Sequence, residues 1–129
     1  MALQSLFIVS VPVSDQDRSK TFYTEKLGFD VRADDLFGPR RWVQLQPPAG
    51  GTSITLVTWF PTMPPGSLKG LVIECDDVEA TAAELSARGV ALNEDIQDAP
   101  WGRFTSLDDP DGNGWVVQQT HLAHHSSAG

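Results

Sequence analysis

The sequence predicts an α+β fold built from two tandem copies of one β-α-β-β-β unit. A short apolar segment followed by a capped helix pattern occurs twice, and each helix pattern is followed by three strand-like segments. The two halves also match position by position. Arg41 aligns with Arg103 and Leu45 with Leu107, at a constant offset of about 62 residues. A repeat of one whole supersecondary unit explains all three observations.

The first copy is expected to span about residues 4–60. Its first strand is predicted at 6–13, where β-branched and other apolar residues dominate. Ser14 and Asp15 then provide an N-cap signal, and Gly28 provides the left-handed residue that ends the helix. The three following strands are predicted at 30–33, 42–46 and 54–58.

The second copy is expected to span about residues 68–120, after a proline-rich linker. Asp77 caps its helix and Gly89 ends it. Its strands are predicted at 71–75, 90–92, 103–107 and 115–119, and the segment DPDGN forms a turn before the last strand. The polar tail, residues 121–129, is expected to fray.

The composition indicates one globular domain with an acidic surface. The 129 residues include 17 Asp and Glu against 9 Lys and Arg, a formal net charge of −8. Nucleic acid is therefore not expected as a partner, because its phosphates would be repelled. No apolar run approaches the roughly 20 residues of a membrane helix, so no membrane partner is expected. Cys75 is the one cysteine, which suits a reducing cytoplasm.

Each predicted unit covers one face of its sheet with its helix and leaves the other face bare. Two such units curving toward each other would form a half-open curved sheet, a cup lined by the two bare faces. The unpaired strands at its edges favour pairing with a second chain, so a symmetric homodimer is expected.

Four stretches together resemble the vicinal oxygen chelate superfamily of glyoxalases, bleomycin-resistance proteins and extradiol dioxygenases. These stretches are VPVSDQDRSKTFYTEKLGF, GLVIECDDVEATAAELSARGV, PWGRF and DDPDGNGWVVQQ. The resemblance covers nearly the whole chain, in order and at the expected spacing. It implies one domain with the glyoxalase/bleomycin resistance-like fold.

Enzymes of that superfamily hold one divalent metal with four side chains, usually His, Gln or Glu. The resemblance places these ligand positions at Ile8, Thr55, Gly70 and Val116. Hydrocarbon and glycine offer no donor, and a threonine hydroxyl is a poor ligand for a transition metal. No metal ligand and no cofactor are therefore expected, and metal-dependent glyoxalase or dioxygenase chemistry is put in doubt.

Side-chain alternation along the strands nominates residues that line the cup, and it puts Trp42 and Gln44 on one common face of their strand without deciding which face that is. Pockets for small molecules combine apolar walls with a few polar groups, and this set is of that kind. The candidate ligand-binding residues are Ser10, Trp42, Gln44, Thr55, Trp59, Trp101, Arg103, Phe104 and Gln118. Trp115 alternates toward the helix and is expected in the core.

The favoured function is metal-independent binding, in which the protein sequesters or carries a small, partly aromatic molecule, as drug-resistance members of the superfamily do. An acidic cup also suits a cationic ligand. The alternatives are a glyoxalase-like lyase or isomerase, a dioxygenase-like metalloenzyme, an enzyme using Glu74 as a carboxylate base, and a module that binds nothing. His121, His124 and His125 form an H-x-x-H-H cluster in the tail that is expected to be solvated.

Overall fold

The structure is a computed structural model that describes residues 2–121, and it confirms the predicted α+β fold with two β-α-β-β-β repeats. The chain divides into two compact units. Unit 1 comprises the chain up to Leu68 together with Pro110–Asn113, and unit 2 comprises Lys69–Asp109 and the chain from Gly114 onward. The predictions for His124 and His125 lie outside the described residues.

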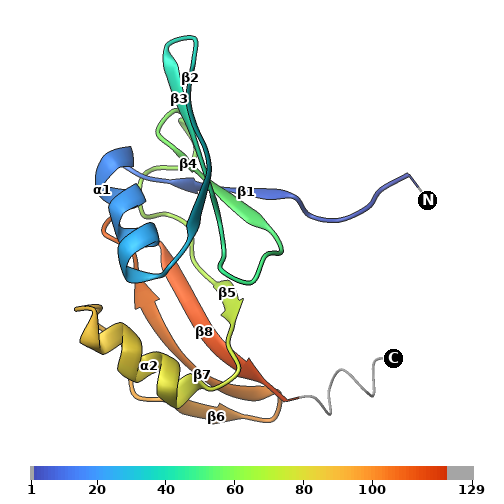
Figure 1. The fold of residues 1–129 in the computed structure, drawn as a ribbon, viewed down its shortest axis with the longest axis vertical. Coiled ribbons are helices and arrows are strands. Elements are labelled where there is room, and N and C mark those ends of the chain that lie inside the picture. The colour runs from blue at the N-terminus through green and yellow to red at the C-terminus, as the bar shows by residue number, and fades with distance from the viewer. Residues whose placement is uncertain (1, 122–129) are drawn as a thin grey trace. The chain divides into compact units, whose positions relative to one another are not determined.

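Unit 1 contains a four-stranded sheet and one helix (Figure 1). The strand order is β1-β4-β3-β2, with β1 and β4 parallel and the other neighbours antiparallel. Figure 1 shows the β2–β3 hairpin as the longest hairpin of this sheet. The elements are β1 (Ile8–Pro12), α1 (Gln16–Thr21), a π-helical turn (Phe22–Lys26), β2 (Asp30–Phe37), β3 (Arg40–Gln46) and β4 (Ser53–Val57).

Local sequence explains where the first helix begins and ends. The Asp15 carboxylate caps it by accepting a hydrogen bond from the backbone N–H of Arg18, at 3.0 Å. The last turn widens, because the N–H of Leu27 donates to the carbonyl of Phe22, five residues earlier. Gly28 then takes φ 78°, a left-handed conformation that suits glycine.

The core of unit 1 lies between this helix and the sheet. Val11, Val43 and Leu56 are fully buried and lie side by side on three neighbouring strands. Tyr23 of the π-helical turn is also fully buried and its ring lies 5.5 Å from that of Phe29. The alternation of valine and leucine with polar residues along β3 therefore directs one face of the strand into the core.

Unit 2 repeats this arrangement with a second sheet in the order β5-β8-β7-β6. Asp77 caps the helix through a hydrogen bond from the N–H of Ala80. Val78, Ala82 and Leu85 form the buried stripe of this helix. The elements are β5 (Leu71–Glu74), α2 (Val78–Ala87), β6 (Gln97–Ala99), β7 (Gly102–Asp108) and β8 (Gly114–Thr120).

Two strand predictions are corrected by the structure. The strand expected at 90–92 is wrong: Leu92 makes only an isolated bridge to Leu107, and the edge strand is β6. Val90 is buried, but it follows the end of α2, where its N–H donates to the carbonyl of Leu85, and it is not part of the sheet. In unit 1, β2 continues beyond Ala33 to Phe37, because its partner strand is long enough to pair with every one of these residues.

The turn Pro110–Asn113 belongs to unit 1 although the strands on either side of it belong to unit 2. The Asp111 carboxylate accepts hydrogen bonds from the N–H and hydroxyl of Ser14, from Arg18 and from the hydroxyl of Ser19. The Asn113 side chain is fully buried, donates to the carbonyl of Pro12 and accepts from the N–H of Leu68. The turn thereby satisfies polar groups at the ends of β1 and α1.

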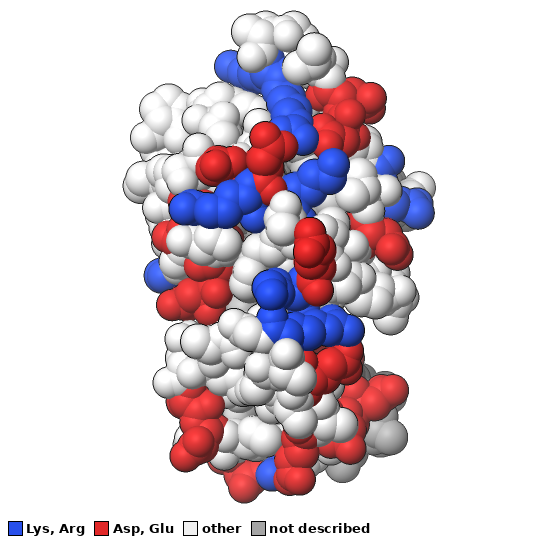
Figure 2. Space-filling model, turned by 60° about the vertical axis from the view of Figure 1, so that its left-hand side comes forward, with Lys and Arg blue, Asp and Glu red and all other residues white. Residues whose placement is uncertain are grey.

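The molecular surface carries charges of both signs. On the face drawn in Figure 2, basic and acidic groups are interspersed rather than gathered into one basic patch. Within residues 2–121, no helix has the length and apolar character needed to cross a lipid bilayer.

Candidate functional site

The two faces of the first sheet differ in what covers them. Asp34 and Arg41 bond to Lys20 and Asp17 of α1, so the rows of side chains that alternate with them lie on the opposite face. We call this opposite face the first open face. It is formed by Ile8, Ser10, Trp42 and Gln44, which are half-buried, and by Ser53 and Thr55, which are buried.

Four predicted site residues gather on the first open face. Ser10, Thr55 and Gln44 are direct partners on three neighbouring strands, and Trp42 lies two residues before Gln44 on the same strand. The Trp42 indole N–H donates to the Gln44 amide oxygen at 3.4 Å. The Thr55 hydroxyl donates to the carbonyl of Val43 at 3.0 Å. An indole ring, an amide and a serine hydroxyl therefore lie together on one half-buried surface.

Trp59, a further predicted residue, follows β4 and is half-buried. Its ring lies 5.4 Å from the guanidinium carbon of Arg40, and 6.3 Å from the ring of Phe60. Arg40 was not among the predicted residues. Its alternation with Trp42 along one strand is the signal that places it on the same face.

The second sheet is divided in the same way. Arg103 donates to Glu79 of α2, and the amide oxygen of Gln119 accepts from the N–H of Val78 at the start of that helix. Since Arg103 and Gln119 are direct strand partners, their row faces α2. The neighbouring row therefore lies on the other face, which we call the second open face. Its residues are Val72, Glu74, Phe104, Ser106, Val116, Gln118 and Thr120.

Three of the predicted residues form one row across this second open face. Glu74, Gln118 and Phe104 are direct partners on β5, β8 and β7. Thr120, which was not predicted, joins two of them: its hydroxyl donates to Glu74 at 3.3 Å and accepts from the Gln118 amide at 3.0 Å. Its position two residues beyond Gln118 was the available signal.

Two predicted residues lie elsewhere. Arg103 is on the face that α2 covers, where it bonds to Glu79 and Asp98. The hydrogen bond with Glu79 is the main cause that raises the Arg103 pKa above its usual value. Trp101 lies in the turn between β6 and β7 and is 51% exposed. We therefore leave Arg103 out of the proposed binding surface.

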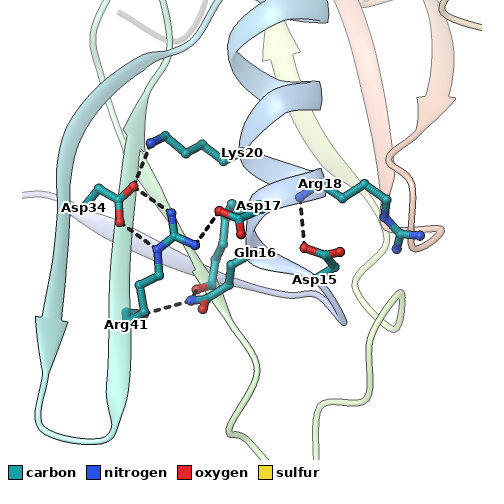
Figure 3. Close-up of polar contacts among 8 residues, drawn as sticks. Asp15, Gln16, Asp17, Arg18, Lys20, Asp34 and Arg41 are labelled. Atoms are coloured by element: carbon teal, nitrogen blue, oxygen red, sulfur yellow. Dashed lines mark hydrogen bonds and ion pairs between the residues drawn. The ribbon is translucent and has the colours of Figure 1, made fainter.

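Arg103 repeats the role that Arg41 plays in unit 1. Arg41 bonds to Asp34 of β2 and to Asp17 in the first turn of α1 (Figure 3). Arg103 likewise bonds to Asp98 of the edge strand β6 and to Glu79 in the first turn of α2. In each unit an arginine thus ties the helix to its sheet, as the repeat predicts.

Asp34 lies at the centre of this network in unit 1, between Arg41 and Lys20 (Figure 3). These hydrogen bonds, with that from Arg41 the larger cause, hold the pKa of the Asp34 carboxyl well below its usual range. The folded state therefore binds the proton of Asp34 less readily than the unfolded state does. The resulting stabilisation is present above the unfolded pKa of about 3.9 and declines as the pH falls below it.

We expect Asp34→Asn to lower the free energy of unfolding by about 1 kcal/mol at neutral pH and by less near pH 3. Urea unfolding at several pH values measures this difference. Asp30→Asn changes an exposed carboxylate at the start of the same strand and is the matched control. A loss for Asp34→Asn that does not depend on pH would contradict the assigned ion pairs.

The family positions for a metal do not provide a metal site. Ile8 and Val116 carry hydrocarbon, Gly70 has no side chain, and the Thr55 hydroxyl already donates to a backbone carbonyl. Within residues 2–121, no three His, Cys, Asp or Glu side chains are grouped so as to hold a metal ion. The donor set therefore does not fit the divalent cation that the resemblance implies.

Cys75 does not have the environment of a catalytic thiol. Burial is the main cause that raises the pKa of its thiol above the ordinary value, and Asp77 and Asp76 add to the effect. A raised pKa lowers the fraction of nucleophilic thiolate near neutral pH.

Comparison with known proteins agrees with the fold. The model of the Glyoxalase/Bleomycin resistance protein/Dioxygenase superfamily matches residues 5–117. The uncharacterised protein YetH of Bacillus subtilis (strain 168) is 32% identical over 121 residues, which cover 91% of this chain and 99% of YetH.

Two solved structures from Streptomyces sp. CB03234 are similar over most of the chain. TnmS3, described as an antibiotic binding protein, is 48% identical, with a TM-score of 0.89 over 94% of this chain and 99% of TnmS3. A protein described as a glyoxalase/bleomycin resistance protein is 50% identical, with a TM-score of 0.81, and the match covers 89% of this chain and 100% of that protein's chain.

Proposed function

This chain belongs to the Glyoxalase/Bleomycin resistance protein/Dioxygenase superfamily, and we propose that it binds and sequesters a small, partly aromatic molecule of the antibiotic type without metal. The observation that carries the proposal is the first open face, where Trp42 and Gln44 lie beside Ser10 and Thr55. The 48% identity to TnmS3 supports the antibiotic class of the ligand.

The chemistry of these side chains fits binding rather than turnover. An indole ring provides a large flat contact for a planar ligand, and the amide and hydroxyl groups orient its polar substituents. The group formed by Ser10, Trp42, Gln44 and Thr55 contains no histidine or carboxylate that could act as a base, and the Thr55 hydroxyl donates to the backbone. The surface thus offers stacking and hydrogen bonding without an activated nucleophile.

We expect the purified chain to bind at least one planar antibiotic of a panel containing bleomycin, doxorubicin and proflavine, with quenching of tryptophan fluorescence. Trp42→Ala should weaken that binding by about 30-fold, because an aromatic contact at the centre of a binding surface is worth about 2 kcal/mol. Trp42→Phe should retain most of the affinity, since the flat contact remains.

Two outcomes would contradict the proposal. The first is that no compound of the panel binds below roughly 100 μM, about −5.5 kcal/mol. The second is that mass spectrometry finds the bound compound chemically changed, which would assign an enzymatic activity instead. Unchanged thermal unfolding of both Trp42 variants is the control for folding.

We further propose that the working form is a symmetric dimer in the cytoplasm. Unit 1 exposes large apolar side chains, and β1 pairs on one side only, with β4. A second copy of the chain would cover these groups and the free strand edge. The exposed residues are Leu3, Leu6, Phe7, Leu36 and Phe37. Light scattering on the samples used for binding should give twice the chain mass of 14.0 kDa.

A further inference from the structure

The second open face presents a carboxylate, Glu74, that has no ion-pair partner among residues 2–121. Glu74 is exposed, and its one hydrogen bond within the described chain comes from the hydroxyl of Thr120. The ion pairs of residues 2–121 involve other carboxylates: Asp17, Asp34, Glu79, Glu84, Asp98 and Asp111. Glu74 therefore differs from the acidic residues that stabilise the fold, because its charge is not part of these ion pairs and because it lies on the second open face.

The hydrogen bonds around Glu74 run in one direction. The carboxylate can only accept, so the Thr120 hydroxyl must donate its proton to Glu74, at 3.3 Å. The Thr120 oxygen then accepts from the amide nitrogen of Gln118, at 3.0 Å. This order also fixes which way the Gln118 amide is turned. Within residues 2–121, the second carboxylate oxygen of Glu74 and the amide oxygen of Gln118 both remain available as acceptors.

Apolar groups surround these acceptors. Phe104 is the direct strand partner of Gln118, and Val72 pairs with Val116 in the adjacent row. Val72 is 55% exposed and Phe104 is partly exposed. A ligand on this face therefore meets hydrocarbon and an aromatic ring together with two acceptors, one of them negatively charged.

We propose that Glu74 determines the specificity of the second open face, by selecting aromatic ligands that carry a protonated nitrogen, as an acridinium ring or an ammonium group does. This inference rests on the proposed function, because it extends small-molecule binding to a second surface, in unit 2, and names the ligand class that this surface prefers. The N–H of the protonated nitrogen donates a charge-assisted hydrogen bond to the free carboxylate oxygen, and the ring system covers Phe104 and Val72. The net charge of −8 attracts the same class of ligand from solution. Gln118 and Thr120 act as positioning residues for the carboxylate.

The test compares two planar probes with the same ring system, the cation proflavine and the anion acridine-9-carboxylate. We expect proflavine to bind at least 10-fold more tightly to the unmodified protein at about 0.15 M salt. Glu74→Gln should weaken proflavine binding by about 10-fold and leave acridine-9-carboxylate unchanged or tighter. Thr120→Val removes the hydrogen bond to Glu74 but keeps the charge of Glu74, and it should weaken proflavine binding by about threefold.

Glu79→Gln is the matched control, because it removes the same charge from α2 itself, where Glu79 bonds to Arg103. It should change proflavine affinity by less than about twofold. An equal loss for Glu79→Gln and Glu74→Gln would assign the effect to net charge and overturn the inference. The inference would also be overturned if both probes bound with equal affinity and Glu74→Gln left both affinities unchanged. Binding of the probes would in that case still support the proposed function. Failure of both probes and of the antibiotic panel would instead overturn the proposed function.

Discussion

Gly66→Ala is expected to lower the free energy of unfolding by about 3 kcal/mol or more. Gly66 has φ 80°, where a side chain is strained. A Cβ at this position would also lie 2.0 Å from the backbone oxygen of Asp111, far inside contact distance. That oxygen belongs to the Pro110–Asn113 turn, whose side chains are hydrogen-bonded to Ser14 and Pro12. The clash can therefore be relieved only by moving the turn.

Gly70→Ala separates the two causes. Gly70 has nearly the same backbone conformation, φ 81°, but nothing lies within 4 Å of the Cβ it would acquire. It should lose only about 1 kcal/mol, the cost of a left-handed alanine. Urea unfolding with an unchanged slope measures both losses. Similar losses for the two variants would contradict the close approach of Gly66 to the turn.

Asn113→Ala is expected to cost about 3 kcal/mol. The substitution leaves the carbonyl of Pro12 and the N–H of Leu68 without the partners that Asn113 provides, at 2.8 Å and 3.1 Å. Asn113 is fully buried, so water does not replace these bonds without opening the structure.

Two further variants show whether the bonds or the volume matter. Asn113→Asp has nearly the same shape and keeps an acceptor for Leu68, but it turns a carboxylate toward the carbonyl of Pro12. It should therefore be at least as destabilising as alanine at neutral pH. Asn93→Ala, at an exposed asparagine bonded to Ser106 and Asp108, should cost less than about 1 kcal/mol. An Asn113→Ala protein as stable as Asn93→Ala would refute the role assigned to the turn.

Most of the fold was predictable because its signals are local. Asp15 and Asp77 cap the two helices, and Gly28 and Gly89 take positive φ at their ends. The repeat adds a check that no single motif provides, since each signal occurs at matching positions in both halves. The family resemblance is confirmed by the match over residues 5–117.

The errors arose where pairing partners outweigh local composition. The strand prediction in unit 1 ended at Ala33, yet the long β3 pairs with the whole segment up to Phe37, and Arg41 and Lys20 neutralise Asp34 within it. The apolar segment around Val90 looked like a strand, but its side chain packs into the core without joining the ladder. Neither outcome depends on neighbours that are close in sequence.

Alternation along strands located most of the candidate site. It placed Ser10 with Thr55, and Glu74 with Gln118, on faces that the helices leave uncovered. It did not reveal that Arg103 is held by Glu79 and Asp98, because an ion pair across elements has no periodicity in sequence. The role of Thr120 likewise depends on a hydrogen-bonded chain that only the folded strands bring together.

The membership of Pro110–Asn113 in unit 1 has a consequence for synthesis of the chain on the ribosome. The amino-terminal repeat emerges first, but Asn113, whose side chain bonds to the Pro12 carbonyl and the Leu68 amide, follows Leu68 by 45 residues (113 minus 68). Folding of the early half is therefore completed only when the late hairpin has left the exit tunnel. This order delays the folding of the nascent protein and makes the folding of the first repeat depend on the second.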